Sequence, residues 1–393
     1  MNYIFISPNY PDGHWRYAAA LRLAGHNVLG LGDAGDETFR PELRGNLTEY
    51  RRVGDLHDYD AVYRTCAYFV SRYGRIDDIE SLNPYWCDLV EALNMEFCDE
   101  PILPAECWES MAVGFADSPL LPVSARVSSA DEAAAFAAEH GWPLLAVPVS
   151  DKRPWQRLTA DAGQLAALFS VPAGKTVIKG EGGSAAPYDG DWMLYAQIAG
   201  EPISVDGLCG LGDDGRQMLT AVAAHAVRED GALWYVPLSD EERERVLELV
   251  AQTVECGFFH IDAVRLPSAV KGLGKRGELL FNAVEDAPPH EYVMDCMNIE
   301  FDCDLRAVWA GMGDVNEPRE RRYCAGAACR RFGRSYRNSH EKILRRLADR
   351  LKIHERTADS DKTRFGDYVY IFRGTDAAEL RRGVKYITED FAK

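Results

Sequence analysis

Residues 258–285 read FFHIDAVRLPSAVKGLGKRGELLFNAVE. Apolar and polar residues alternate over Phe258–Leu266, and they alternate again over Glu278–Glu285, on either side of a glycine-rich connection. Alternation over short runs is typical of strands that bury one face. The stretch therefore predicts a β-hairpin with a long loop.

The two predicted strands carry Asp262 and Glu285. Carboxylates on neighbouring strands can point to one face of a sheet, and Mg²⁺ prefers such hard oxygen ligands. We therefore predict Asp262 and Glu285 as a metal-binding pair, with His260 on the same face as Asp262. The alternative is a solvated outer face on which these acids bind nothing and His260 is only packed or hydrogen-bonded.

The N-terminal residues predict an open α/β sheet. A buried strand at 3–6 and a helix at 15–24 are followed by a second strand at 27–31. This order of elements is typical of parallel sheets. Gly30-Leu-Gly32-Asp-Ala-Gly35 is similar to a dinucleotide fingerprint, but it follows the second strand, so we interpret it as a turn. A helix at 60–73 and a strand at 76–80 come next.

Further elements are predicted along the rest of the chain. Ser239-Asp-Glu-Glu242 is a capping-box pattern before an amphipathic helix that Gly257 ends. The other predicted elements are helices at 130–140 and 376–391 and strands at 143–149, 176–179, 193–206 and 368–373.

The segment Thr176-Val-Ile-Lys-Gly-Glu-Gly-Gly-Ser184 joins a strand, a lysine and a glycine-rich turn. Backbone N–H groups and an ammonium can surround phosphates in this way, which makes Lys179, Gly180, Gly182 and Gly183 candidate nucleotide ligands. The segment lacks the G-K-[ST] ending of a Walker loop, and a flexible hairpin turn is the alternative. No Ser/His/Asp or Cys/His arrangement of a hydrolase is recognisable.

Length and composition limit the function classes. The chain has 393 residues, enough for two or three domains, and it is 47% apolar and 27% charged, as expected for a soluble globular protein. Its 62 acidic and 44 basic residues give a net charge of −18, which argues against nucleic acid and acidic membranes as main partners. None of the 10 cysteines forms a C-x-x-C pair, and we expect a cytoplasmic protein with reduced thiols.

Charge is unevenly distributed along the chain. Residues 77–109 hold 10 acidic residues and no lysine or arginine, whereas residues 319–352 hold 12 basic and 3 acidic residues in what is predicted to be mostly helix. The basic segment could bind phosphates, an acidic partner, or residues 77–109 of this or another chain, through Arg330, Arg331 and Arg334 among others. The alternative is a solvated helix face.

The chain resembles the ATP-grasp superfamily, specifically proteins similar to the large chain of carbamoyl phosphate synthase. The residues that carry the resemblance are the opening 3–33, then Phe259-His-Ile-Asp262, Gly272-Leu-Gly-Lys-Arg-Gly-Glu-Leu279, Pro288-Pro289, Tyr292, Asp295, Met297-Asn298 and Trp309-Ala310. The resemblance implies an α/β protein: a Rossmann-like pre-ATP-grasp domain at 1–104, an ATP-grasp unit at 105–318 with lobes at 105–192 and 193–318, and a basic C-terminal extension at 319–393.

ATP-grasp enzymes hold MgATP between two lobes and make an acyl phosphate that an amine or thiol attacks. The resemblance places Val147 where the family has a lysine, and Ala283 and Ala287 where it has a glutamate and an arginine. The loop at 150–155, which includes Lys152, has no glycine. We therefore expect a weakly active or non-catalytic protein that serves as a binding or regulatory partner. The cofactors would be ATP and Mg²⁺ if the site functions, and none otherwise.

The alternative is an active ATP-dependent carboxylate–amine ligase. In that case Asp262 and Glu285 would hold Mg²⁺, and Lys179 or Lys152 would contact phosphates. A third possibility is a binder of a small molecule or peptide in the cleft between the first domain and the ATP-grasp unit. Expected partners are a small-molecule carboxylate or a peptide, a protein partner or a second copy of the chain, with no nucleic acid and no membrane.

Overall fold

The structure is a computed structural model that describes residues 1–98, 124–149, 157–169, 178–179, 185–186, 191–196, 199–212, 214–254, 256–269 and 274–391. Contacts divide the chain into two compact units. Unit 1 comprises Met1–Ala105, Pro202–Asp262 and Glu285–Lys393, and unit 2 comprises Glu106–Glu201 and Ala263–Val284. No helix of the described residues is long and apolar enough to span a membrane.

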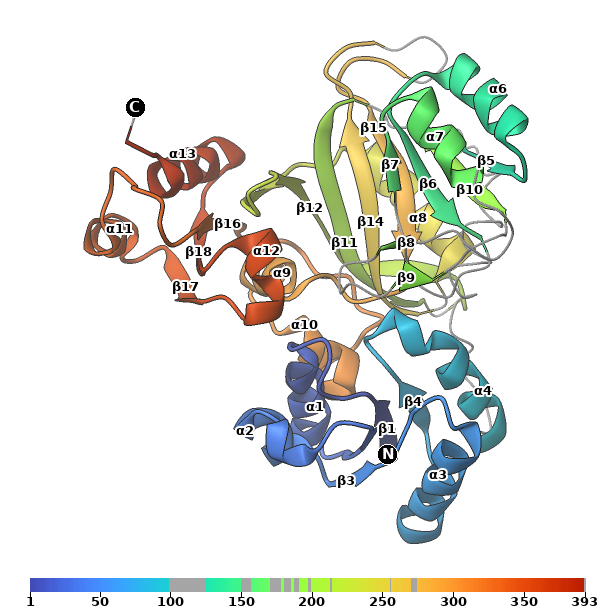
Figure 1. Cartoon of the computed structure of the whole chain (residues 1–393). Coiled ribbons are helices and arrows are strands. Elements are labelled where there is room, and N and C mark those ends of the chain that lie inside the picture. Colours follow the sequence, from blue (N-terminus) through green and yellow to red (C-terminus); the bar gives the residue numbers. More distant parts are fainter. Residues whose placement is uncertain are drawn as a thin grey trace. The chain divides into compact units, whose positions relative to one another are not determined.

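The N-terminal part of unit 1 is the predicted parallel sheet (Figure 1). Its strand order is β3-β2-β1-β4, and β1 pairs in parallel with both β2 and β4. The elements are β1 (Asn2–Ile6), α1 (His14–Leu23), β2 (Asn27–Gly32), η1 (Asp36–Thr38), α2 (Pro41–Asn46), β3 (Glu49–Arg52), α3 (Tyr59–Tyr73), β4 (Asp78–Glu80), η2 (Pro84–Trp86) and α4 (Cys87–Phe97).

The interpretation of the glycine motif as a turn is wrong for two of its three glycines. Gly30 and Gly32 lie inside strand β2. A Cβ on Gly30 would lie 2.9 Å from the Tyr50 ring, and one on Gly32 would lie 2.8 Å from the Tyr50 hydroxyl. These glycines therefore make room for an aromatic side chain of the neighbouring strand β3, which a local pattern could not reveal.

Unit 2 contains a four-stranded antiparallel sheet with two helices. The strand order is β5-β10-β6-β7, and β8 pairs only with β9. The single strand predicted at 193–206 is two strands, because β10 ends before β11 begins. The elements are β5 (Ser124–Val127), α6 (Ala130–His140), β6 (Leu144–Pro148), β7 (Arg157–Thr159), α7 (Ala162–Phe169), β8 (Ile178–Lys179), β9 (Ala185–Ala186) and β10 (Trp192–Ala196).

An eight-stranded sheet has the order β15-β14-β11-β12-β13-β16-β18-β17. The predicted hairpin is confirmed, because β14 and β15 are neighbours, and so is the capping box of α8 at Ser239 and Glu242. The elements are β11 (Glu201–Leu211), β12 (Gln217–Val227), β13 (Leu233–Val236), α8 (Asp240–Thr253), β14 (Gly257–Arg265), β15 (Leu279–Glu285), α9 (Glu291–Phe301), α10 (Leu305–Ala307), η3 (Val308–Met312), β16 (Cys324–Arg330), α11 (His340–Leu347), β17 (Leu351–Arg356), η4 (Asp359–Asp361), α12 (Lys362–Phe365), β18 (Tyr368–Gly374) and α13 (Ala377–Thr388).

The basic segment at 319–352 is not mostly helix, as the sequence had led us to expect. It forms β16, the eight-residue helix α11 and the start of β17. All seven residues of β16 are buried, and the strand lies between β13 and β18 in the sheet. Arg330 donates to the carbonyls of Asn338 and Ile387, and Arg331 donates to those of Lys362 and Thr363. Two of the three arginines predicted to face a partner therefore bind the chain's own backbone.

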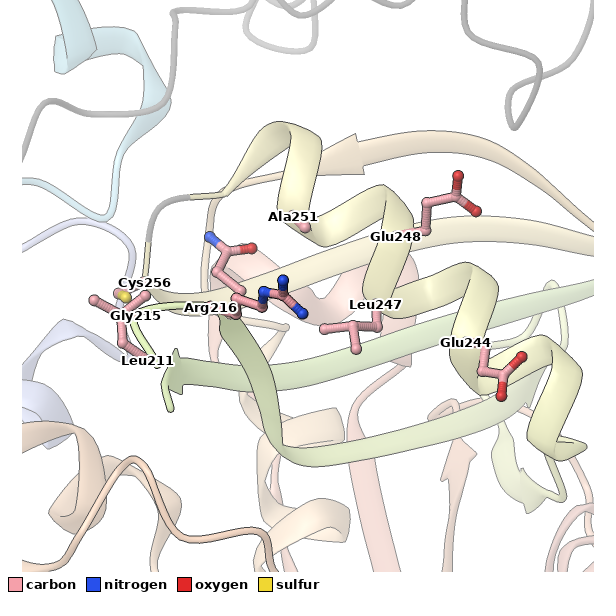
Figure 2. Close-up of a pocket in the computed structure, with 9 residues that line it drawn as sticks. Leu211, Gly215, Arg216, Glu244, Leu247, Glu248, Ala251 and Cys256 are labelled. Carbon is pink, nitrogen blue, oxygen red and sulfur yellow. The ribbon is translucent and has the colours of Figure 1, made fainter. Parts of the chain in front are cut away.

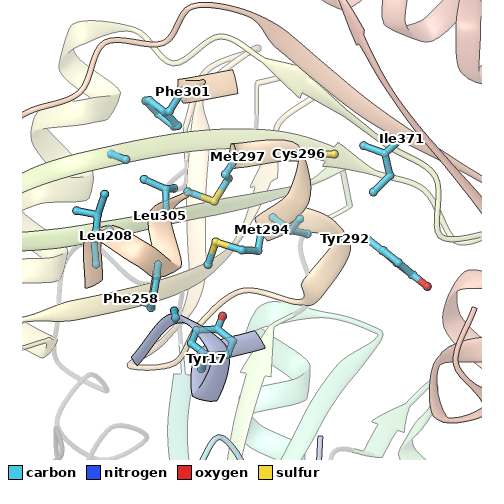
Figure 3. Close-up of a cluster of buried hydrophobic side chains, with 14 of the residues drawn as sticks. Tyr17, Leu208, Phe258, Tyr292, Met294, Cys296, Met297, Phe301, Leu305 and Ile371 are labelled. Atoms are coloured by element: carbon cyan, nitrogen blue, oxygen red, sulfur yellow. The ribbon is translucent and has the colours of Figure 1, made fainter. Parts of the chain in front are cut away.

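A core cluster in unit 1 joins α1 to the helix α9 and to the eight-stranded sheet (Figure 3). Tyr17 of α1 is 2% exposed and meets Phe258 of β14 edge-on, with 6.0 Å between the ring centroids. Met294 and Met297 of α9 are fully buried in the same cluster. Flexible thioethers fill irregular gaps between differently shaped elements well.

A buried ion pair links the helix α9 to strand β12 of the eight-stranded sheet. The side chains of His225 on β12 and Glu300 on α9 are both fully buried, and His225 Nε2 is 3.3 Å from Glu300 Oε1. Burial by itself would lower the pKa of His225, but the charge of Glu300 outweighs it and raises that pKa above its ordinary value. The Ala325 backbone N–H also donates to Glu300 Oε1, at 3.0 Å.

Gly207 in β11 allows this strand to pack closely against its neighbours β14 and β12. A Cβ there would lie 2.2 Å from the Phe259 ring and 2.6 Å from the Ala221 carbonyl oxygen. We expect Gly207→Ala to lower the free energy of unfolding by about 1–3 kcal/mol through overpacking. Gly45→Ala, in a helix with open space around that position, should instead raise it by about 0.5–1 kcal/mol. Urea unfolding measures both changes in free energy. Equal effects of the two substitutions would contradict the close packing at Gly207.

The His225–Glu300 pair predicts a dependence of stability on pH. Because folding raises the pKa of His225, its contribution to stability is fully present below the ordinary pKa of about 6.5 and is lost as pH rises through the raised value. The difference in unfolding free energy between the wild type and His225→Gln should therefore shrink as the pH rises above about 6.5. His140→Gln is the control. A pH-independent difference for His225→Gln would refute the charged pair.

Candidate active site

The predicted carboxylates lie on the neighbouring strands β14 and β15. Phe259, Ile261 and Ala263 of β14 are buried, whereas the Asp262 side chain between them is 63% exposed and His260 is 19% exposed. The alternation predicted for 258–266 holds only over 259–263, where His260 and Asp262 lie on one face, because Phe258 and Val264 on that same face are buried. Glu285, the last residue of β15, is half-buried.

His260 is held between two carboxylates. Its Nδ1 is 2.7 Å from Asp206 Oδ1 on β11, and its Nε2 is 3.5 Å from Asp262 Oδ1. Asp206 is fully buried, and the Ser204 hydroxyl also donates to it. The imidazole therefore has one fixed orientation, set by a buried acid on one side and facing an exposed acid on the other.

The charges in this group act on one another. Burial would lower the pKa of His260, but Asp206 and Asp262 outweigh it and raise that pKa well above its ordinary value. Desolvation would raise the pKa of Asp262, but the hydrogen bond and charge of His260 bring it below its ordinary value. Desolvation raises the pKa of Glu285, although His260 and Arg364 oppose it.

Asp262 and Glu285 fit a magnesium ion by the chemistry of their donors. Mg²⁺ usually binds one or two protein carboxylates and keeps its remaining positions for water and substrate phosphates. Two carboxylates on neighbouring strands, one of them exposed, have the donor chemistry that this requirement asks for. Within the described ranges no group of three or more His, Cys, Asp or Glu side chains could hold a metal by itself, so a cation here would take its remaining oxygens from water or a ligand.

The nucleotide-binding predictions are untested by the structure. Lys152, Gly180, Gly182 and Gly183 lie outside the described residues. Lys179 is in the two-residue strand β8, which pairs with β9. The backbone of Val147 pairs with Met193 in the sheet of unit 2. These residues remain predictions as phosphate ligands.

Sequence reasoning missed Asp206 and Arg364. Asp206 was visible as the one acid inside the otherwise uncharged run 202–211, which is a recognisable signal for a buried charge with a partner. Arg364 comes from the short helix α12, and its charge acts on both Asp262 and Glu285. No local pattern marks it, because it lies 79 residues after Glu285.

A separate groove of about 870 Å³ lies between α8 and the turn that joins β11 to β12 (Figure 2). Leu247 and Ala251 of α8 and Leu211 supply apolar surface, and Arg216, Glu244 and Glu248 supply charge. Figure 2 shows that Leu247 points from the helix toward the strands. The groove shares no residue with the group around Asp262.

Comparisons with known proteins give the fold. No protein-family model matches the chain, and no curated protein does either. Among solved structures, glycinamide-RNase-transformylase T from Mycobacterium tuberculosis is 15% identical, with a TM-score of 0.62 over 98% of this chain and 99% of that one. Phosphoribosylglycinamide synthetase from Anaerococcus prevotii is 9% identical, with a TM-score of 0.62 over 100% and 99%. N5-carboxyaminoimidazole ribonucleotide synthetase from Thermotoga maritima is 12% identical, with a TM-score of 0.62 over 97% and 96%.

These similarities extend over nearly the whole chain, so the fold is that of ATP-grasp enzymes with their N-terminal α/β domain. The predicted fold class is confirmed. The finer resemblance to the large chain of carbamoyl phosphate synthase stays a prediction.

The two carboxylates that contact His260 provide a matched test of the site. Asp206→Ala removes the fully buried carboxylate that is the main counter-charge of the partly buried His260 imidazole, and we expect it to lower the free energy of unfolding by about 3–5 kcal/mol. Asp262→Ala removes an exposed partner of the same ring and should cost less than about 1 kcal/mol. Urea unfolding at neutral pH measures both. Equal costs would mean that Asp206 does not hold the imidazole.

Proposed function

We propose that the chain is an ATP-dependent ligase that joins a carboxylate to an amine. The observation that carries the proposal is that Asp262 and Glu285 come from the neighbouring strands β14 and β15, in a chain whose fold matches ATP-grasp enzymes from end to end. Fold similarity at this identity does not transfer an activity. The proposal therefore depends on the chemistry of the site.

The proposed reaction has two steps. A substrate carboxylate oxygen attacks the terminal phosphorus of ATP, and ADP leaves. The amine then attacks the carbonyl carbon of the acyl phosphate, which releases inorganic phosphate and forms the amide while the amine loses a proton. Both steps build negative charge on phosphate oxygens, so electrostatic stabilisation is the main requirement.

The chain's own residues would meet part of this requirement. Asp262 and Glu285 would hold Mg²⁺, which when bound neutralises phosphate charge. His260, fixed by the buried Asp206, would orient the exposed carboxylate of Asp262 toward the ligand. Lys179, Lys152 and the amides of Gly180, Gly182 and Gly183 remain proposed phosphate ligands, and the proposed substrates are a small-molecule carboxylate or peptide and an amine.

A second candidate is a non-catalytic ATP-grasp protein that acts as a binding or regulatory partner. Val147, Ala283 and Ala287 stand where the resembling family has a lysine, a glutamate and an arginine, and this loss favours the second candidate. The ion pair between His260 and Asp262 favours it as well, because a bound metal would have to compete for that carboxylate. Only the ligase should convert ATP to ADP and phosphate, so a turnover measurement separates the two candidates.

Nucleotide binding and turnover test the proposal. We expect MgATP to bind the purified full chain in calorimetry, with binding lost in chelator, and ADP and phosphate to appear with a suitable carboxylate and amine. Asp262→Asn and Glu285→Gln should each lower the rate at least about a hundredfold, because each removes a metal ligand. Asp240→Asn, at the start of α8, is the matched control.

The outcomes separate the candidates. MgATP binding without turnover over a panel of carboxylates and amines would favour the non-catalytic protein. Absence of binding at millimolar MgATP would refute the ligase.

A further inference from the structure

The outer end of the eight-stranded sheet carries two histidines and two tyrosines on one face. His354 of the edge strand β17 lies opposite Tyr370 of β18 in the strand register, and Tyr368 is two residues before Tyr370. Residues that lie opposite one another, or two apart on one strand, share a face of a sheet. His340, the first residue of α11, meets the same face, because its ring centroid lies 5.4 Å from that of Tyr368 and 5.7 Å from that of Tyr370.

A tyrosine hydroxyl holds each imidazole by the same nitrogen. His340 Nδ1 is 2.9 Å from the Tyr370 hydroxyl, and His354 Nδ1 is 2.9 Å from the Tyr368 hydroxyl. Within the part of the chain that the structure describes, Nε2 of neither ring has a hydrogen-bond partner. When Nδ1 carries the proton, it donates to the tyrosine oxygen, and the lone pair of Nε2 can bind a metal ion. Both rings are therefore fixed in the way that metal-binding histidines are.

The separation of the two imidazoles suits a single metal ion. Their ring centroids are 5.6 Å apart, and the ring planes make an angle of 62°. Zinc binds histidine nitrogen at about 2.0–2.1 Å, so two imidazoles on one tetrahedral zinc ion have ring centres roughly 5 Å apart. Imidazole nitrogen suits zinc, whereas Mg²⁺ and Ca²⁺ prefer oxygen ligands. The pair thus matches zinc both in spacing and in the chemistry of its donor atoms.

We propose that His340 and His354 bind one zinc ion through their Nε2 atoms. The site shares no residue with the carboxylates Asp262 and Glu285, and the inference does not depend on the proposed function. His354 is exposed and His340 is half-buried, so a zinc ion can reach the pair from solvent. Two protein ligands leave the remaining positions of the ion to water, and binding should be weaker than at structural zinc sites, which use four. The bound ion would join α11 to the edge strand β17.

Calorimetry with zinc chloride on the full-length chain tests the site. Excess Mg²⁺ is present throughout, because it occupies oxygen ligands and leaves imidazole nitrogen free. We expect micromolar zinc binding that His340→Gln and His354→Gln each weaken at least about tenfold, since each removes one of two protein ligands. Tyr368→Phe should also weaken zinc about tenfold, because the hydroxyl that orients His354 is lost.

His57→Gln is the matched control. His57 is an exposed histidine, but both of its ring nitrogens already have partners, Nδ1 at Asp55 and Nε2 at the Tyr85 hydroxyl. Its substitution should leave the zinc affinity unchanged. If the wild type binds no zinc, or if only one or neither of the substitutions at His340 and His354 weakens binding, the inference is wrong and the proposed function is unaffected.

NMR of nitrogen-labelled histidines in the wild type gives a second measurement that does not depend on the folding of a variant. Zinc should shift the Nε2 signals of two histidines while their Nδ1 atoms stay protonated. Zinc binding through Nδ1 would break the contacts with the tyrosines and would contradict the inference.

Discussion

A carboxylate buried inside a sheet is the constraint on which the site depends. Asp206 has no exposed surface, and an unpaired charge in that position would destabilise the fold by several kcal/mol. His260 on the adjacent strand β14 supplies the counter-charge. Because a slip of one residue would turn His260 to the opposite face of the sheet, this pair fixes the register of β14 against β11. The same register brings Asp262 to the exposed face, so the position of the candidate metal ligand follows from the neutralisation of a buried acid.

The elements that the sequence predicted are those with a local signal. The capping box at Ser239 and Glu242, the alternation along β14 and the opening parallel sheet each depend on residues close together in the chain. The same alternation predicts that Asp262 lies on the less buried face of β14. The bond between Asp206 and His260 spans 54 positions, and periodicity carries no information about such a pairing. The prediction for the basic segment is wrong for a related reason. A run of arginines is typical of a solvated surface, but Arg330 and Arg331 donate hydrogen bonds to the backbone carbonyls of Ile387 and Lys362, which are distant in sequence.

The cations around the carboxylates come from parts of unit 1 that are far apart in sequence. His260 stands two residues before Asp262, whereas Arg364 is in the short helix α12, about a hundred residues further along the chain. The family pattern would place its positive charge on the last strand, where this chain has Ala287. The residues of β15 and the turn after it therefore lack the positive charge that the family pattern has there. The charge of Arg364 nevertheless lowers the pKa of Asp262 and opposes the rise in the pKa of Glu285.

The C-terminal strands also determine which backbone groups of the sheet meet water. β16 pairs with β13, and β18 and β17 continue the sheet beyond it. Truncation after residue 318 would leave the outer edge of β13 without a partner and would uncover the buried side chains of α9 that cluster with β16. An unpaired strand beside apolar surface is a template for intermolecular pairing. A shortened chain should therefore self-associate, because the C-terminal strands cover that edge of the sheet.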